Sequence, residues 1–477
     1  MNKAMMIDFY ELTMANGYFE SGKKDQIAYF DLYYRKNPDN GGYALFSGLE
    51  SIIKYIDDLN FNDDDIEFLR SKNVFSDSFL DYLRDFKFTG DVYSFKEGSV
   101  VFPNEPIITI KAPIIEAQIL ETYLLQVLNH QTLIATKASR IKYSSKDKIV
   151  LEMGARRAHG LTSSLDGARA AYIGGVDATS NVLSDQVYGV PSGGTMAHSW
   201  VQMFDSEYEA FKTYANIYPN HSTFLVDTYD TLSIGVPNAI KVIKEVLLPK
   251  GIKNFSIRID SGDLTYLSKE ARKMLDDAGL ENCTITVSNS LDERIIKDLL
   301  IQGAQIDIFG VGERLITAKS DPVFGSVYKL VAIEEDGVII PKIKLSDNVE
   351  KITTPHFKSV YRIIDEEGHF DADLVTLHDE VVKEKEPLTI FDPKNIWKQK
   401  TFENFKLQCM QETIYKQGKR VYDLPSLKEV RDYAKNQLDA LWPEVRRFDY
   451  PHQYYVDLSR GLWTVKNNML ESIKDES

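Results

Sequence analysis

Between residues 147 and 345, short apolar runs rich in β-branched residues alternate with helical patterns. Each run ends in small, polar or charged residues; the runs are KIVLEMGARR, AAYIGGVDATSN, YGVPSGGTMAH, STFLVDTYDT, NFSIRIDSGDL, CTITVSNSLD, QIDIFGVGER and VYKLVAIE. Strands that alternate with helices predict βα units and a parallel sheet. Roughly seven such units fit a closed or nearly closed α/β barrel, whose active site gathers at the carboxyl ends of the strands.

Two further zones flank this region. Residues 1–112 hold an amphipathic start, a strand-like QIAYFDLYY, and GDVYSFKEGSVVFPNEPIITIKAP, whose period-2 alternation indicates antiparallel strands. The next segment, IIEAQILETYLLQVLNHQTLIATKASRI, repeats apolar residues at helical spacing and predicts a helix with one buried face. Residues 346–477 mix strand-like segments with an amphipathic helical one.

Composition narrows the class of protein. The chain has 56 Lys and Arg against 71 Asp and Glu, a net charge of −15, which argues against general nucleic-acid binding but leaves room for a local basic pocket. Its two cysteines, Cys283 and Cys409, form no zinc spacing and predict reduced thiols in the cytoplasm. No apolar run approaches the roughly 20 residues of a membrane span, so no membrane association is expected.

The first strand ends that carry chemistry are GARR and PSGGTMAH. Arg156 and Arg157 could converge on an anion from a loop, or could be a surface or interface pair; the pair alone does not separate the two. Thr195 supplies a hydroxyl, and with a helix beginning near it, His198 falls one turn along. That histidine could be a base, a metal ligand or a nucleophile, although a capped, buried histidine is the commoner case.

Carboxylates follow the next strands. Asp227 comes after STFLV, while Arg258 and Asp260 end NFSIRID. Charges at the end of a buried strand are costly unless they are paired or bind something, and carboxylates near phosphates also suit Mg²⁺. Gly310 and Gly312 lack the third glycine of a dinucleotide fingerprint and favour a phosphate nest. The pattern indicates an enzyme that acts on a phosphorylated or otherwise anionic small molecule.

Several blocks together resemble the nicotinate phosphoribosyltransferase family. In order between residues 6 and 345 they are DFYELTMANGYF, GARRAHG, GGVDATSNV, SGGTMAHSWVQMF, LVDTYDT, RIDSGDL, VSNSLDE and GSVYKLVAI. The resemblance implies an irregular or truncated (β/α) barrel at residues 113–345 that carries the active site. It also implies an N-terminal α+β domain at residues 1–112. The C-terminal region, 346–477, would complete this domain, which is the smaller one.

The reaction implied by the resemblance joins nicotinate to 5-phosphoribosyl 1-pyrophosphate, giving nicotinate mononucleotide and pyrophosphate for NAD synthesis. ATP is a co-substrate of this ligase-type reaction and is hydrolysed through a phosphohistidine, with Mg²⁺ as cofactor. The family works as a homodimer with sites at the interface. The remaining alternatives are a nicotinamide or quinolinate phosphoribosyltransferase, and a catalytically silent ligand-binding relative.

Family motifs assign roles residue by residue. His198 matches the phosphorylated histidine, Asp227 the carboxylate that orients it, and Thr195 and Arg258 the nicotinate site. Tyr10 matches an aromatic residue that stacks on the pyridine ring, expected from the partner subunit.

Positions around the ribose phosphate and pyrophosphate are matched by Asp260, Gly310 and Gly312, and the resemblance leaves the metal ligands unknown. Two residues depart from the family pattern. Met153 stands where an aromatic residue usually precedes the glycine of GARR, and Glu313 stands beside the predicted phosphate nest. We expect Glu313 to turn away from a phosphate or to meet Mg²⁺.

Overall fold

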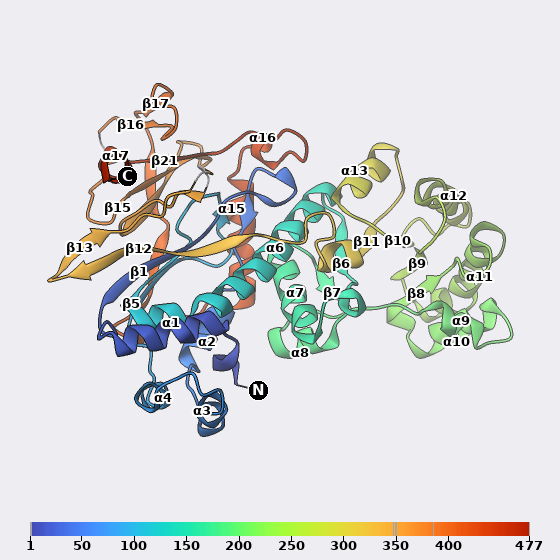
Figure 1. Cartoon of the computed structure of the whole chain (residues 1–477). Coiled ribbons are helices and arrows are strands. Elements are labelled where there is room, and N and C mark those ends of the chain that lie inside the picture. The colour runs from blue at the N-terminus through green and yellow to red at the C-terminus, as the bar shows by residue number, and fades with distance from the viewer. Residues whose placement is uncertain (1, 347, 349–350, 385, 477) are drawn as a thin grey trace. The chain divides into compact units, whose positions relative to one another are not determined.

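The computed structural model describes residues 2–346, 348, 351–384 and 386–476. The chain divides into two compact units (Figure 1). One comprises Met1–Leu133 with Val323–Ser477, and the other comprises Ile134–Pro322; we call them the terminal unit and the central unit. The division of the sequence into three zones at residues 112 and 345 stays a prediction.

The central unit is built on a parallel sheet of six strands. Their order is β7 (Ala178–Thr179), β6 (Ile149–Glu152), β11 (Ile308–Val311), β10 (Thr284–Ser288), β9 (Phe255–Ile259) and β8 (Ser222–Leu225). Every neighbouring pair is parallel, and the order is open, with β7 and β8 at its edges. The predicted truncated α/β barrel is therefore confirmed.

Helices connect these strands and cover the sheet (Figure 1). The longer ones are α7 (Leu161–Ile173), α10 (Glu207–Ile217), α12 (Leu264–Asp277) and α13 (Glu293–Ile301), with shorter α8 (Val182–Tyr188), α9 (His198–Gln202), α11 (Val236–Val242) and α14 (Glu313–Ile316). One face of these strands is apolar, as in Ile257 and Ile259 of β9 and Ile285 and Val287 of β10, which are all 0% exposed. The opposite face carries polar and charged side chains, Ser256 and Arg258 of β9 and Thr286 and Ser288 of β10.

Three of the runs predicted as strands of the parallel sheet differ in the structure: one is a strand of another sheet, and two are strand only in small part. VYKLVAIE forms β12 (Ser326–Glu335), which pairs antiparallel with β1 in the terminal unit. Half of AAYIGGVDATSN is helix α7 and a turn, with only Ala178–Thr179 as strand, and YGVPSGG contributes a single bridge from Ser192 to Thr179. A short apolar run cannot by itself separate a buried strand from a buried helix, nor show which sheet a strand joins.

The terminal unit centres on a seven-stranded sheet. Its order is β13 (Val338–Pro341), β12, β1 (Ile27–Tyr34), β5 (Ile108–Pro113), β3 (Asp91–Phe95), β19 (Gln411–Lys416) and β20 (Lys419–Arg420). The pairing of β19 with β3 brings the C-terminal region into the same sheet as the N-terminal strands. Helix α1 (Phe9–Glu20) packs on α5 (Ile114–Ile119), and α6 (Glu121–Ser145) follows directly.

Other strands and helices of the terminal unit lie around this sheet. A four-stranded sheet has the order β18 (Lys406–Cys409), β14 (Lys358–Ile364), β15 (Phe370–Leu377) and β21 (Tyr455–Leu458). Two-stranded sheets pair β2 (Ala44–Leu45) with β4 (Val100–Val101) and β16 (Leu388–Phe391) with β17 (Gln399–Phe402). The helices are α2 (Leu49–Asp57), α3 (Asp63–Arg70), α4 (Asp77–Arg84), α15 (Leu427–Asp439), α16 (Pro443–Arg446) and α17 (Arg460–Glu476).

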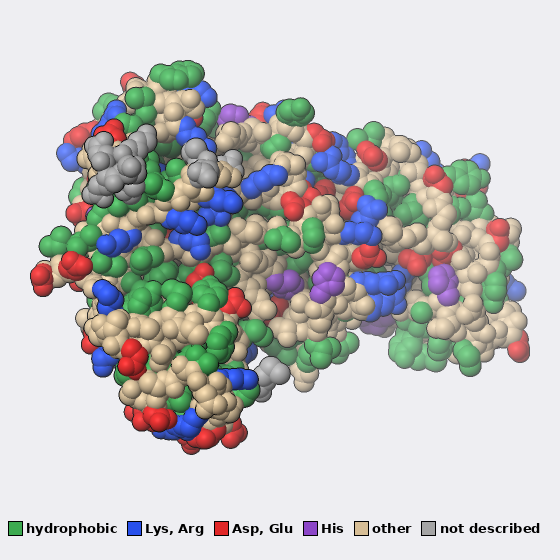
Figure 2. Space-filling model, viewed as in Figure 1, with side chains coloured by type: hydrophobic (Ala, Val, Ile, Leu, Met, Phe, Trp, Pro, Cys, Tyr) green, Lys and Arg blue, Asp and Glu red, His purple; other side chains and the backbone are tan. Residues whose placement is uncertain are grey.

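The surface carries charges of both signs. On the face seen in Figure 2, acidic, basic and hydrophobic side chains are interspersed. Among the described residues, no helix combines the length and the apolar character needed to cross a bilayer.

Candidate active site

The side chains predicted to carry chemistry in the central unit follow strands β8 to β11. Asp227 comes two residues after β8, Arg258 and Asp260 lie at the end of β9, and Ser288 is the last residue of β10. In the ladders, Arg258 is opposite Leu225 on one side and Thr286 on the other, and Ser288 is opposite Gly310. Because the strands are parallel, these residues meet at the edge of the sheet that the carboxyl ends of the strands form.

The Arg258 guanidinium is the centre of the polar contacts at this edge. Its side chain is 15% exposed. Nε donates to Ser288 Oγ at 2.9 Å, Nη1 to Thr195 Oγ1 at 2.9 Å and Nη2 to Asp260 Oδ1 at 3.2 Å. Within the described residues, these bonds use three of the five N–H donors of a guanidinium and leave one on each terminal nitrogen.

His198 lies beside the same carboxylate. It is the first residue of α9, so the helix begins three residues later than the sequence suggested, and the chain from Thr195 to Ala197 is not helical. Nδ1 lies 3.1 Å from Thr228 Oγ1, and Nε2 lies 3.9 Å from Asp260 Oδ2. The structure thus brings Thr195, His198, Arg258 and Asp260 together, while their roles stay predictions.

Asp227 holds the loop that follows β9. Its Oδ2 accepts hydrogen bonds from the Asp260 backbone N–H at 2.9 Å and from Ser261 Oγ at 2.6 Å. Its Oδ1 is buried and, within the described part of the chain, has no hydrogen-bond partner. The contacts of His198 are with Thr228 and Asp260, so the orienting role expected for Asp227 stays a prediction.

A buried carboxylate that sequence reasoning missed lies near Asp227. Glu207, the first residue of α10, is 3% exposed and accepts a hydrogen bond from Asn238 Nδ2 at 3.1 Å. Burial raises the pKa of Glu207, the Asn238 bond opposes that shift, and the charge of Asp227 adds to it. A glutamate at a helix start is an ordinary surface feature, so the sequence carried no signal for this burial.

The two glycines expected to form a phosphate nest sit differently. Gly310 is inside strand β11, and a Cβ there would lie 2.7 Å from Met153 Sδ and 3.2 Å from Ser288 Cβ. Gly312 precedes α14, and a Cβ on it would lie 3.1 Å from the Met153 carbonyl oxygen. Met153, which replaces the family's aromatic residue, therefore packs against both glycines, and their phosphate role stays a prediction.

Glu313, the other departure from the family pattern, is paired with a lysine. Lys319 Nζ donates to Glu313 Oε1 at 2.6 Å, and this bond lowers the pKa of Glu313. The carboxylate is therefore neutralised by a side chain of its own unit.

The remaining predicted residues are more exposed. Arg156 and Arg157 lie in a short 3-10 turn, Ala155–Arg157, and both side chains are exposed. Tyr10, in α1 of the terminal unit, is 46% exposed. Burial of its hydroxyl and the charges of Glu121 and Glu11 raise the pKa of Tyr10, so its ring carries a neutral phenol.

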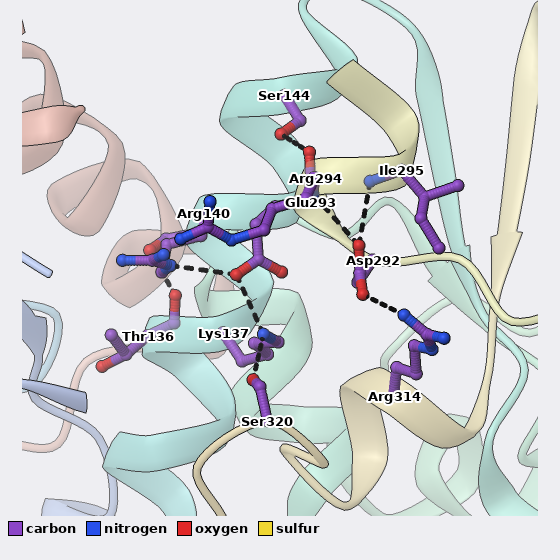
Figure 3. Close-up of polar contacts among 11 residues, drawn as sticks. Thr136, Lys137, Arg140, Ser144, Asp292, Glu293, Arg294, Ile295, Arg314 and Ser320 are labelled. Atoms are coloured by element: carbon purple, nitrogen blue, oxygen red, sulfur yellow. Dashed lines mark hydrogen bonds and ion pairs between the residues drawn. The ribbon is translucent and has the colours of Figure 1, made fainter. Parts of the chain in front are cut away.

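A buried ion cluster anchors the chain after β10 (Figure 3). Glu293 accepts from Lys137 Nζ at 2.9 Å and from Arg140 Nε at 3.2 Å, and all three side chains are at most 4% exposed. Next to it, Asp292 caps α13 by accepting from the Ile295 N–H at 2.9 Å and also pairs with Arg314. The loop that leaves Ser288 thus ends on a fixed point four residues later.

No protein-only metal cage is present within the described residues, because no group of three or more His, Cys, Asp and Glu side chains converges there. Mg²⁺ needs less than that, since it is usually held by one or two carboxylates together with substrate phosphates. Asp227, with its buried and unpartnered Oδ1, and Asp260 are carboxylates of the right type at this edge.

Comparison with known proteins gives consistent matches along the chain. Family models described as the nicotinate phosphoribosyltransferase (NAPRTase) N-terminal domain and the nicotinate phosphoribosyltransferase C-terminal domain match residues 5–129 and 357–466. A nicotinate phosphoribosyltransferase of Bacillus subtilis is 46% identical over 468 residues, which cover 98% of this chain and 95% of that protein.

Solved structures agree with these matches. The crystal structure of human nicotinic acid phosphoribosyltransferase superposes with a TM-score of 0.86 at 30% identity, covering 97% of this chain and 99% of the human one. A nicotinate-nucleotide pyrophosphorylase from Pyrococcus furiosus gives a TM-score of 0.70 at 25% identity, covering 92% and 96%.

Gly235 packs closely against the backbone just before Asp227, and we expect a larger residue there to destabilise the fold. A Cβ at Gly235 would lie 1.8 Å from the backbone oxygen of Val226, the residue before Asp227. We expect Gly235→Ala to lower the free energy of unfolding by about 3 kcal/mol, because backbone cannot yield as a flexible side chain can. The matched control is Gly193→Ala, where a Cβ meets nothing within 4 Å. Urea unfolding measures the stability of both variants. Equal midpoints for the two would contradict the close approach of Gly235 to the Val226 backbone.

Proposed function

Because the chain belongs to the nicotinate phosphoribosyltransferase family, we propose that it transfers the phosphoribosyl group of 5-phosphoribosyl 1-pyrophosphate to nicotinate in NAD synthesis. The products are nicotinate mononucleotide and pyrophosphate. The observation that carries the proposal is the Arg258 clamp, in which Thr195, Ser288 and Asp260 hold a guanidinium with N–H donors to spare.

Arg258 accounts for the choice of an acid over an amide. The two N–H groups left on its terminal nitrogens can donate to both oxygens of a carboxylate, which is the arrangement a guanidinium favours. Nicotinamide has one carbonyl oxygen and an amide N–H₂ that would face the cation as a donor. The guanidinium therefore attracts the carboxylate of nicotinate, whereas the amide N–H₂ of nicotinamide would place one hydrogen-bond donor against another.

The carboxylates suit the chemistry at the anomeric carbon. Departure of pyrophosphate leaves positive character on the ribose ring, as in glycoside cleavage, and a carboxylate beside it stabilises that charge. The position of Asp260 directly after β9 and the 32% exposure of its side chain support this role. Mg²⁺, held by Asp227 and Asp260, would supply positive charge to the leaving pyrophosphate, and Arg156 and Arg157 would add to it.

His198 is the group proposed to couple ATP to the reaction. Its Nδ1 is engaged with Thr228, its Nε2 lies 3.9 Å from Asp260 Oδ2, and its side chain is 40% exposed. Nε2 attacks the γ-phosphorus of ATP, the bond from that phosphorus to the bridging oxygen breaks, and ADP leaves. Water later hydrolyses the phosphohistidine, which makes the overall process ligase-type.

We also propose a homodimer in which Tyr10 of one subunit stacks on the pyridine bound by the other. Support comes from the family resemblance and from the exposure of Tyr10 and Phe9, 46% and 51%, on α1. Aromatic rings stack on heterocycles at little cost in conformational entropy. A cytoplasmic location stays a prediction; both cysteines are free thiols, Cys283 buried and Cys409 exposed.

Arg258→Ala tests the carboxylate site. We expect the KM for nicotinate to rise by at least about a hundredfold, because the variant loses two hydrogen bonds to a charged group and each is worth about 1.5–3 kcal/mol. The KM for nicotinamide, measured in the same steady-state assay, is the internal control and should change by less than about threefold. An unchanged nicotinate KM would place the carboxylate site elsewhere.

His198→Ala tests the coupling. The variant should lose ATP hydrolysis by at least about a hundredfold, since the nucleophile is gone, while slow transfer without ATP persists. His221→Ala is the control, because His221 is exposed and lies outside the matching motif. Phosphate release and nicotinate mononucleotide are measured together. Normal ATP hydrolysis in the His198 variant would remove that residue from its role.

Mixing two variants that are each expected to lack ATP-coupled activity tests the shared site. In a re-equilibrated equimolar mixture of Tyr10→Ala and His198→Ala, half of the dimers are mixed and each has one intact site. ATP-coupled activity should therefore recover to about a quarter of the wild-type value. A mixture that only averages the two variants would show that Tyr10 and His198 act within one subunit or that no dimer forms.

A further inference from the structure

One hydroxyl links the guanidinium proposed to bind nicotinate to the carboxylate that faces His198. Ser288 Oγ accepts the Arg258 Nε–H at 2.9 Å and donates its own proton to Asp260 Oδ1. The direction of both bonds follows from chemistry, because a guanidinium only donates and an ionised carboxylate only accepts. Arg258 Nη2 reaches the same Asp260 oxygen at 3.2 Å, so the three groups close a ring of hydrogen bonds.

The position of this hydroxyl is set by the two neighbouring strands and by the turn that follows it. Ser288 is 5% exposed and ends β10, between Arg258 on β9 and Gly310 on β11. A Cβ on Gly310 would lie 3.2 Å from Ser288 Cβ, so the absent side chain of Gly310 gives Ser288 its space. The chain then turns through two residues with positive φ, Asn289 at 101° and Ser290 at 48°, before Asp292 caps α13.

This ring determines where both charged groups point. Ser288 and Asp260 occupy the Nε and Nη2 side of the guanidinium, and the remaining N–H groups are the two described above on the terminal nitrogens. With Oδ1 of Asp260 bound to Ser288 and Arg258, its Oδ2 is the oxygen that faces His198 Nε2, 3.9 Å away. Without the hydroxyl, Arg258 and Asp260 lose a shared partner and can each rotate.

We propose that Ser288 is a positioning residue that aligns Arg258 for a pyridine carboxylate and Asp260 toward His198, and thereby sets the preference for nicotinate over nicotinamide. The inference rests on the proposed function and extends it to a residue of the block VSNSLDE to which the family motifs assigned no role. A residue that merely stabilises the fold would impair both pyridines equally, so the ratio of kcat/KM for nicotinate to that for nicotinamide separates the two roles.

The test uses Ser288→Ala in the full chain with Ser256→Ala as matched control. Ser256 is a buried hydroxyl on the neighbouring strand β9 that bonds the Thr284 carbonyl at 2.9 Å and Thr286 Oγ1 at 3.2 Å. It is not one of the three residues that accept a hydrogen bond from the Arg258 guanidinium within the described part of the chain. We expect Ser288→Ala to raise the nicotinate KM about tenfold and to lower the nicotinate-to-nicotinamide ratio by a similar factor. Ser256→Ala should leave both within about twofold.

Ser288→Cys is measured beside it, because a thiol keeps the shape of the side chain and a weaker donor. Its nicotinate KM should lie between those of wild type and Ser288→Ala, and this variant carries the test if the alanine variant does not fold. A selectivity ratio at the wild-type value in whichever Ser288 variants fold would overturn the inference. A wild-type protein that makes no nicotinate mononucleotide would instead overturn the proposed function.

Discussion

A guanidinium at the end of a buried strand is the constraint on which the site depends. Arg258 lies between Leu225 and Thr286 in the parallel ladders, where removal of a charge from water is expensive unless partners replace the solvent. Thr195, Ser288 and Asp260 are those partners, and they come from three different segments of the central unit. The same bonds that compensate the charge also orient it, so stability and recognition have a common origin.

The scaffold around that charge is rigid for identifiable reasons. Asp227 ties the loop after β9 to the loop after β8 through the Asp260 N–H and the Ser261 hydroxyl. The loop after β10 ends on Asp292 and on the buried cluster of Glu293 with Lys137 and Arg140. The three bonds of Arg258 orient its guanidinium, and within the described residues they leave two N–H donors for the proposed carboxylate.

Sequence reasoning reached the parallel sheet and its charged edge because the relevant strands are short, apolar and end in charges. Strands β8 to β11, and with them Asp227, Arg258 and Asp260, follow from periodicity alone. The assignment of β12 to the barrel was wrong, because strand pairing depends on long-range contacts with β1 that no local pattern encodes. Ser288 was missed for a similar reason: a serine after a buried run is ordinary until Arg258 and Asp260 are seen on either side. The family resemblance is confirmed, while the roles of single residues and the ATP coupling stay proposals.

The central claim is that this edge of the sheet selects a pyridine carboxylic acid with a single carboxylate and joins it to a phosphoribosyl group. The most direct measurement offers wild-type protein equal concentrations of nicotinate, nicotinamide and quinolinate with 5-phosphoribosyl 1-pyrophosphate, Mg²⁺ and ATP, and separates the nucleotide products by chromatography. The account predicts nicotinate mononucleotide from nicotinate as the dominant product, with one pyrophosphate released for each nucleotide formed. Dominant nicotinamide mononucleotide, consumption of quinolinate with release of CO₂, or no nucleotide at all would contradict it.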